Sequence, residues 1–383
     1  MIASRVDNLF PSGIRAMMAL AAERTRQGLP VLHMESGQPH FPTPPHVVEA
    51  AVDAARNGLT GYTPNTGISS LRSAVAERVN DRNGLALDES NVCITSGAVM
   101  GLYLALMAIL EQGDEVLVPD PGWPNYHSAV SMAGGRSVAY PLRPEAGYQL
   151  RVEDLESVVT PRTRAIMINF PGNPTGAVLP AEGIGELLAF AQQHDLFVVS
   201  DEVYEDFVFD GVHSSILMNG LTDRLIMVSG ASKSYSMTGW RLGWLVADSK
   251  LVAAAAKLVE PITSCPNSLS QVAAETALRG PQDCVRVMRD AYARSAQRVV
   301  EILQPPGLLP VVPNGAFYAL IDISRSGLTS DVFARQLLTT GGVAVAPGST
   351  FGDRTAHMVR ISTACSEEDL VRGCSIIKNV LLA

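Results

Sequence analysis

The sequence predicts an α/β protein with two domains, a large one built on a mostly parallel sheet and a smaller α+β one. Short apolar runs of four to six residues alternate with amphipathic helical segments through most of the chain, and strands separated by helices pair in parallel through crossovers. After Pro305, Pro306 and Gly307 the order of the elements changes. The length of 383 residues leaves room for two hydrophobic cores.

The expected strands of the large domain lack the strict alternation of apolar and polar residues that is typical of half-exposed strands. This indicates that they are buried on both faces. They cover residues 91–95, 115–118, 164–169, 196–200, 225–228 and 242–246. Apolar residues at helical spacing predict the helices between and around these strands. The helices cover residues 14–27, 44–57, 68–83, 98–112, 181–194, 251–259, 268–279 and 281–303.

The C-terminal part follows the order strand, helix, strand, strand, helix. Its expected strands cover residues 316–322, 343–346 and 357–362, and its helices cover residues 331–339 and 366–381. Helix 281–303, which a proline opens at its first turn, would bridge the two parts. We therefore expect a large domain at residues 45–284 and a small domain at residues 1–44 plus 285–383.

The composition excludes several classes of protein. With 47% hydrophobic residues the chain is not intrinsically disordered. A net charge of -9 and the lack of a Lys/Arg cluster argue against a nucleic-acid partner, and no apolar stretch suggests a signal peptide or a membrane span. The five cysteines are odd in number and form no C-x-x-C pair, so we expect neither a disulfide framework nor a metal site, and a cytoplasmic location.

Ligands of open α/β sheets bind beyond the carboxyl ends of the strands, so the residues that follow each apolar run are candidates for a site. Gly97 and Ala98 follow the first run and open a helix, whose free N–H groups and dipole attract an anion; a tight turn explains the same residues. Trp123 follows the second run in a proline-framed loop. It could stack on a flat ligand or simply fill the core.

Two further strand ends carry polar side chains. Asn173 is the only hydrogen-bonding side chain at the centre of loop 170–176, and turn chemistry explains the prolines and glycines of this loop but not the asparagine. Asp201 ends a buried strand, where a carboxylate is costly unless it meets a cation or a ligand. A salt bridge to an arginine is the alternative explanation.

Lys233 stands out because the chain has 25 Arg and only 4 Lys. It follows a buried strand in a loop of small residues, with Arg241 eight residues further on. Lys250, Lys257 and Lys378 lie in expected helices or at a helix start. For these three, a solvated surface role suffices.

These strand ends together offer an anion cradle, a stacking ring, a carboxylate, hydrogen-bond donors and an amine. Such a set suits a planar, phosphorylated, cationic heterocycle that bears an aldehyde, which describes pyridoxal 5'-phosphate (PLP). The carboxylate would keep the pyridinium nitrogen protonated, so that the ring accepts electrons from a substrate carbanion. The lysine would form the Schiff base.

With these residues, the sequence resembles the fold-type I PLP enzymes, specifically the class I aminotransferases of the bacterial aspartate/aromatic type. The resemblance covers nearly the whole chain and implies a seven-stranded, mostly parallel sheet in the large domain. It rests on Ser36-Gly37-Gln38-Pro39, Gly61-Tyr62-Thr63-Pro64-x-x-Gly67, Asn173-Pro174-Thr175-Gly176, Asp201-Glu202-Val203-Tyr204, Ser232-Lys233-x-Tyr235-x-Met237-Thr238-Gly239-Trp240-Arg241, Gly315-Ala316-Phe317-Tyr318 and Arg360-Ile361-Ser362.

The resemblance implies a role for each matching residue. Lys233 would form the aldimine and act as the acid and base, and Arg360 would clamp the substrate α-carboxylate. Asp201 would pair with the pyridine nitrogen, Tyr204 and Asn173 would hydrogen-bond the phenolic oxygen, and Trp123 would stack on the ring. The phosphate would be bound by Ala98, Val99, Ser232, Arg241 and Tyr62 of the partner subunit. The substrate would be contacted by Gly37 and Asn173.

The activity implied by the resemblance is a ping-pong transfer of an amino group from an L-amino acid to a 2-oxo acid, in a homodimer. Val99 stands where the aspartate-specific subgroup has a lysine for the distal carboxylate, which argues against strict aspartate specificity. No second arginine that reads the substrate side chain can be identified. The alternatives to an aminotransferase are another PLP enzyme on the same scaffold (a C–S β-lyase, another lyase, a decarboxylase or an oxidase) or a PLP-sensing regulator.

Overall fold

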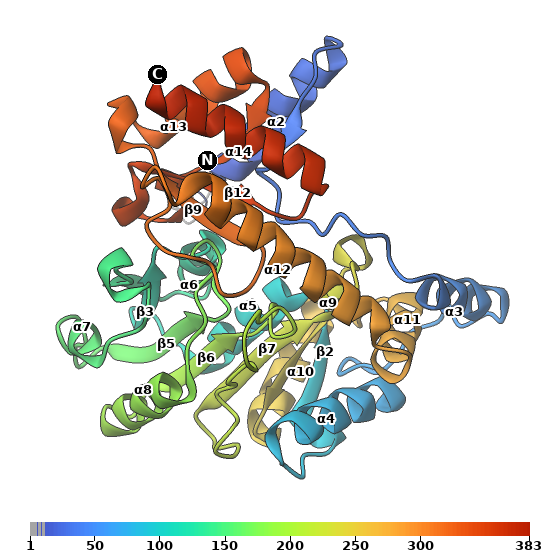
Figure 1. Ribbon diagram of the computed structural model, residues 1–383. Coiled ribbons are helices and arrows are strands. Elements are labelled where there is room, and N and C mark those ends of the chain that lie inside the picture. Colours follow the sequence, from blue (N-terminus) through green and yellow to red (C-terminus); the bar gives the residue numbers. More distant parts are fainter. Residues whose placement is uncertain (1–5, 7–8, 10–11) are drawn as a thin grey trace.

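A computed structural model describes Val6, Leu9 and residues 12–383. A central sheet lies between helices on both faces, and a smaller group of helices and short strands sits at one end of it (Figure 1). The seven strands of this sheet confirm the expected fold-type I class.

The order of the strands places the carboxyl ends of six of them at one edge. The strands from β7 to β4 run parallel, and β8 is antiparallel to both of its neighbours, so β2 runs in the same direction as β7. Across the sheet the order is β2 (Val92–Thr95), β8 (Gly243–Ala247), β7 (Leu225–Gly230), β6 (Phe197–Asp201), β5 (Thr163–Asn169), β3 (Glu115–Asp120) and β4 (Arg136–Pro141).

Each face of the sheet packs against its own set of helices, because successive side chains of a strand point to opposite faces. In β3, Val116 and Val118 pack into one core and Leu117 packs into the other. The first core contains α5 (Ala98–Ile109), α6 (Asn125–Met132) and α10 (Ser249–Thr263). The second contains α3 (Pro45–Arg56), α4 (Ser69–Asn83), α7 (Val152–Glu156), α8 (Ala181–Gln193) and α11 (Ser268–Arg279).

A third core joins the N-terminal segment to the C-terminal part of the chain. Met17 and Met34 pack there against Val299, Phe333 and Ile377. The elements involved are α2 (Gly13–Arg26), β1 (Leu32–His33), α12 (Asp283–Leu303), β9 (Tyr318–Asp322), α13 (Ser330–Gln336), β10 (Val343–Ala344), β12 (Met358–Ser362) and α14 (Glu367–Leu382). Strand β11 (Ala346–Pro347) pairs with β12. The division of the chain at residues 45 and 284 stays a prediction.

The apolar pattern missed five elements, namely β4, α6, α7, the two-residue strand β1 and the four-residue helix α9 (Ala231–Ser234). Strand β4 lies at the edge of the sheet, and only its last two residues are buried, so it does not read as an apolar run. Helices α6 and α7 span eight and five residues, which is too short for a periodic pattern. The strand expected at residues 343–346 is two strands, because β10 pairs with β1 and β11 pairs with β12.

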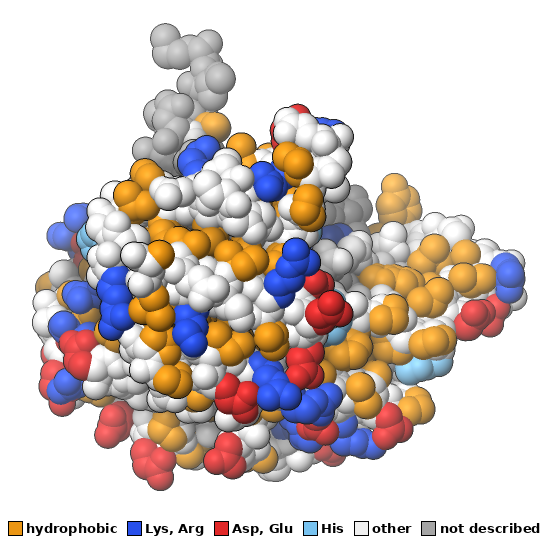
Figure 2. All heavy atoms as spheres, turned by 45° about the horizontal axis from the view of Figure 1, so that its top comes forward, with side chains coloured by type: hydrophobic (Ala, Val, Ile, Leu, Met, Phe, Trp, Pro, Cys, Tyr) orange, Lys and Arg blue, Asp and Glu red, His pale blue; other side chains and the backbone are white. Residues whose placement is uncertain are grey.

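Charged side chains of both signs are interspersed over the face that Figure 2 shows. Several ion pairs of the protein lie within one helix, such as Arg26 with Glu23 and Arg298 with Glu301. Within the described residues, no helix combines the length and the apolar character that a membrane crossing requires.

Candidate active site

A cavity of about 600 Å³ lies beyond the carboxyl ends of the parallel strands and is also lined by residues of α2, β9 and β12. It collects every site residue named from the sequence except Tyr62. These residues are Gly37, Ala98, Val99, Trp123, Asn173, Asp201, Tyr204, Ser232, Lys233, Arg241 and Arg360. Tyr62 is 91% exposed and lies outside the cavity of its own chain.

Lys233 lies on α9 (Ala231–Ser234), a single turn that follows β7 directly. Its Nζ donates a hydrogen bond of 2.7 Å to the carbonyl oxygen of Gly37. The same atom lies 5.9 Å from the centre of the Tyr204 ring. The amine is therefore held inside the cavity by a neutral acceptor, and it forms no direct ion pair with a described residue.

Burial shifts the pKa values of the amine and of the nearby carboxyl in opposite directions. It lowers the pKa of Lys233 to about 8, although the charge of Asp201 opposes the shift. It raises the pKa of Asp201 to about 6, although the hydrogen bond from Tyr126 opposes that shift. The Tyr126 hydroxyl donates to Asp201 Oδ2 over 2.8 Å. The cavity thus holds an amine and a carboxyl that both titrate near neutral pH.

Arg360 on β12 is only 1% exposed. Its guanidinium lies between the rings of Tyr318 and Phe351, 4.4 and 4.9 Å from their centres. It donates to Asn173 Oδ1 over 3.1 Å and to the carbonyl oxygen of Glu35, while Nε has no partner among the described residues. A buried guanidinium with an unused N–H group, lining a cavity, fits a carboxylate ligand.

Asn169 ties two of the strand-end loops together. Its Oδ1 accepts from the backbone N–H of Asn173 over 2.9 Å, and its Nδ2 donates to the carbonyl oxygen of Asp201 over 2.9 Å. Next to them, the hydroxyls of Tyr204 and Tyr318 share a hydrogen bond of 2.8 Å. The amide of Asn173 and the hydroxyl of Tyr204 therefore have fixed positions on the cavity wall.

An anion site lies at the beginning of α5. Gly97 has a φ of 83° and precedes the helix; a Cβ atom there would lie 2.5 Å from Nη2 of Arg241. The N–H groups of Ala98 and Val99 belong to the first turn and have no intrahelical partner. With Ser232 these groups line one part of the cavity, and together they suit a phosphate.

Trp123 lies on the wall near Asp201. Its ring packs edge-on against Tyr126, with the centroids 5.5 Å apart and the planes at 82°. The backbone N–H of neighbouring Gly122 donates to the carbonyl oxygen of Phe351 over 2.8 Å. The position of the tryptophan is thus fixed by contacts on two sides.

The cavity is also lined by residues that received no role from the sequence, among them Arg15, Tyr126, Asn169 and Tyr318. Tyr318 belongs to a motif that supported the family resemblance, but it received no role. Tyr126 lies in α6, a helix that the pattern did not predict. Arg15 lies on the N-terminal helix, far in sequence from every strand end.

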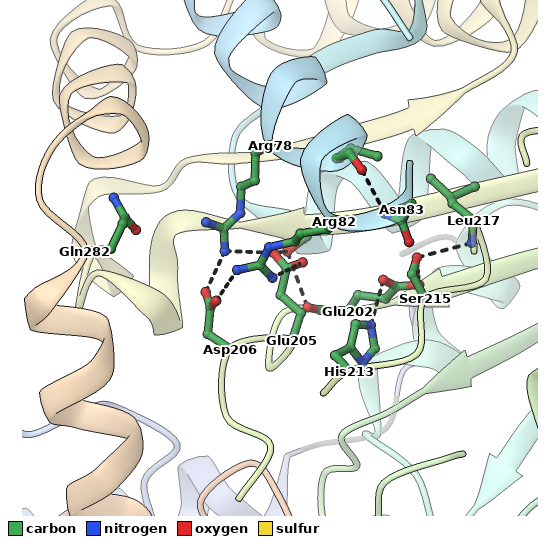
Figure 3. A network of polar contacts seen from close by, with 12 residues as sticks. Arg78, Arg82, Asn83, Glu202, Glu205, Asp206, His213, Ser215, Leu217 and Gln282 are labelled. Atoms are coloured by element: carbon green, nitrogen blue, oxygen red, sulfur yellow. Dashed lines mark hydrogen bonds and ion pairs between the residues drawn. The ribbon is translucent and has the colours of Figure 1, made fainter. Parts of the chain in front are cut away.

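A buried ion-pair network holds the segment that follows Asp201 (Figure 3). Arg78 and Arg82, from α4, both pair with Glu205 and Asp206. The side chains of Arg78, Glu205 and Asp206 are 13%, 5% and 6% exposed, so water screens these charges weakly. The network ties α4 to the carboxylate-bearing segment of the cavity.

A second buried cluster lies beside this network in Figure 3 and centres on Glu202. His213 Nε2 lies 2.8 Å from Glu202 Oε2, and the hydroxyls of Ser200 and Ser215 donate to Oε1 over 3.0 and 3.1 Å. Burial acts to raise the pKa of Glu202, but the neighbouring His213 and the hydrogen bonds lower it overall. The ionised Glu202 therefore anchors the chain immediately after Asp201.

We expect Arg78→Met to cost about 3–5 kcal/mol of the free energy of unfolding, because it leaves two buried carboxylates with one partner fewer. Urea unfolding of the holoenzyme measures this cost. Arg279→Met is the matched control, since Arg279 pairs with Glu77 on the surface and such a pair contributes about 0–1 kcal/mol. Equal losses in the two variants would contradict a special role of the buried network.

The cavity fits PLP on the chemistry of its donors. The N–H groups and Arg241 suit a phosphate, Trp123 offers a flat surface, and Asp201 offers a buried carboxyl to a ring nitrogen. The amine of Lys233 suits an aldehyde. Arg360 remains for a carboxylate that does not belong to the cofactor.

Comparison with known proteins agrees with this fit. Residues 30–377 match the model of the family described as aminotransferase class I and II. The chain is 39% identical to aromatic-amino-acid aminotransferase 2 of Thermococcus litoralis and 39% identical to an aspartate aminotransferase of Pyrococcus abyssi, in both cases over 99% of this chain and 98% of the relative. The solved aspartate aminotransferase of Thermus thermophilus with maleate superposes with a TM-score of 0.94 at 37% identity, covering 99% of each chain.

The chain therefore belongs to the class I and II aminotransferase family. It is a PLP-dependent transaminase, as the sequence motifs had indicated. The lyase alternative is not favoured, because these relatives are aminotransferases.

Proposed function

We propose that the cavity around Lys233 is the active site of this aminotransferase and that it exchanges an amino group between L-amino acids and 2-oxo acids by a ping-pong route. The observation that carries the proposal is the meeting of an amine, a carboxyl and a buried guanidinium, from Lys233, Asp201 and Arg360, in one cavity. Each of the three supplies a different chemistry, and none duplicates another.

The cofactor would be held by three groups of residues. Its phosphate would be bound by Ala98, Val99, Ser232 and Arg241, and its ring would be covered by Trp123. Its phenolic oxygen would accept hydrogen bonds from Asn173 and Tyr204. Asp201 pairs with its ring nitrogen. When bound, PLP supplies an electron sink for the electrons released at the substrate α-carbon.

The chain's own residues bind the substrate and move the proton. Arg360 takes the α-carboxylate in a bidentate contact, and Gly37 and Asn173 line the same part of the cavity. This contact fixes the substrate, so that its α-hydrogen faces the amine of Lys233. The neutral amine then removes the α-proton and later returns a proton as the general acid. The lowered pKa of Lys233 supports this role, because a larger fraction of the amine is neutral near pH 7.

The titration of Lys233 can be measured directly in the cofactor-free protein, because the chain has only 4 Lys. Reductive methylation with formaldehyde requires the neutral amine. We expect the rate at Lys233 to rise with pH and to level off above about pH 8. Mass spectrometry of the peptide that contains Lys233 gives this rate at each pH. A rate at Lys233 that keeps rising well above about pH 8 would contradict the lowered pKa.

A donor and acceptor screen tests the proposed function. The holoenzyme is incubated with L-glutamate, L-aspartate, L-phenylalanine, L-tyrosine or L-alanine as donor and with 2-oxoglutarate, oxaloacetate or pyruvate as acceptor. We expect each mole of donor lost to yield one mole of new amino acid, with parallel double-reciprocal plots. If none of these donors supported transfer, the proposal would be contradicted. Release of ammonia and pyruvate from cystathionine without an acceptor would contradict it as well.

We also propose a homodimer in the cytoplasm. Two observations support the proposal. Tyr62 is 91% exposed although its aromatic ring and hydroxyl suit a binding site, and none of the five cysteines forms a disulfide. Light scattering of the holoenzyme tests the dimer, and a monomeric mass would contradict it.

A further inference from the structure

Among the described residues that line the cavity, one cationic side chain has no part in the proposed function. Lys233, Arg241 and Arg360 have proposed roles with the aldehyde, the phosphate and the α-carboxylate. The remaining cation of the lining is Arg15, on the first turn of α2. The guanidinium of Arg15 forms no hydrogen bond or ion pair within the described part of the chain.

The stability of α2 does not explain this arginine. A cation in the first turn of a helix is unfavourable with respect to the helix dipole, and Arg15 pairs with no acidic residue of the first turn. The two arginines near the other end of the same helix differ, because Arg24 donates to the carbonyl oxygens of Pro30 and Thr339 and Arg26 pairs with Glu23. Arg15 is therefore the arginine of α2 that is left for a ligand.

The fold fixes the position of this helix turn. Met17 and Ala21 are buried in the third core, and the Ser12 hydroxyl accepts from the backbone N–H of Arg15. Gly13 approaches Thr350 so closely that a Cβ atom there would lie 2.1 Å from the threonine Oγ1. The helix backbone at Arg15 is thus held against the C-terminal part of the chain, while the Arg15 side chain reaches the cavity.

The surroundings of Arg15 accept an anion. Ile14, Met18 and Val99 also line the cavity and carry no charge, and the carboxylate that the described lining contains, Asp201, faces Tyr126. A substrate with an apolar side chain could contact the same three residues. Within the described lining, Arg15 is the cation that remains for a second carboxylate on the substrate.

We propose that Arg15 is a specificity-determining residue that binds the side-chain carboxylate of dicarboxylic amino acids and 2-oxo acids. This proposal rests on the proposed function, because it requires Arg360 to hold the α-carboxylate. A guanidinium matches a carboxylate with two parallel N–H···O bonds. Monocarboxylic substrates use Arg360 and leave Arg15 without a partner.

The test compares kcat/KM for L-glutamate with kcat/KM for L-alanine in the holoenzyme. We expect Arg15→Ala to lower the ratio of the two values by about 10- to 100-fold, as expected for the loss of charge-assisted hydrogen bonds. Arg15→Lys should restore part of the ratio. Arg26→Ala removes the same charge from the same helix outside the cavity and should leave the ratio unchanged.

A binding measurement gives a second readout that does not depend on turnover. Succinate should raise the melting temperature of the wild-type holoenzyme more than propionate does at the same concentration, and Arg15→Ala should remove this difference. An unchanged glutamate-to-alanine ratio in Arg15→Ala, or an equal change in Arg26→Ala, would overturn the proposal. In either case, wild-type transfer from any donor would show that the proposed function itself stands.

Discussion

Lys233→Ala is expected to lower kcat for amino-group transfer by at least about 10⁴-fold. Among the residues that line the cavity, Lys233 is the only lysine, so its loss removes both the attachment point and the base that moves the α-proton. Single-turnover measurements with enzyme in excess over donor follow a rate as slow as this. The amino acid formed from the 2-oxo acid is quantified by chromatography.

Lys257→Ala is the control for this experiment, since Lys257 is an exposed lysine on α10. Its kcat and its melting temperature should match those of the wild type. If Lys233→Ala retained more than about a tenth of the wild-type kcat, another group would have to act as the base.

The second large effect is expected for Asp201→Asn. The amide keeps the shape of the side chain and can still accept the hydrogen bond of Tyr126, but it can hold no negative charge next to a ring nitrogen. We expect kcat to fall by about 10²- to 10³-fold, with little change in KM. Steady-state kinetics with the best donor of the screen gives both values.

Two further variants separate charge from structure. Asp210→Asn changes an exposed carboxylate nine residues further along the chain and should leave kcat unchanged. Tyr126→Phe removes the hydrogen bond to Asp201 but keeps its charge, so its loss of kcat should be clearly smaller than that of Asp201→Asn. A larger loss in Tyr126→Phe would mean that the hydrogen bond, and not the charge, matters.

Most of the site could be predicted because it lies at strand ends. A buried strand reads as a short apolar run, and the residues that follow it must lie at the same edge of a parallel sheet. Ala98, Asn173, Asp201 and Lys233 were found in this way, and the cavity indeed contains all four. Their individual roles stay predictions until the variants are measured.

The remaining features depend on tertiary contacts that no local pattern records. Strand β4 is an edge strand and is mostly half-buried or exposed, so its sequence lacks an apolar run. The strand expected at residues 343–346 divides because its two halves pair with different partners. Arg15 reaches the cavity only because α2 packs into the C-terminal core, more than three hundred residues away in sequence from Ile377.

Borohydride reduction of the holoenzyme followed by peptide mass spectrometry shows directly which amine holds the cofactor. We expect the reduced cofactor on the peptide containing Lys233 and on none of those containing Lys250, Lys257 or Lys378. Incubation with an accepted amino-acid donor before reduction should abolish the adduct. An adduct on another lysine, or one that the donor does not remove, would contradict the role proposed for Lys233.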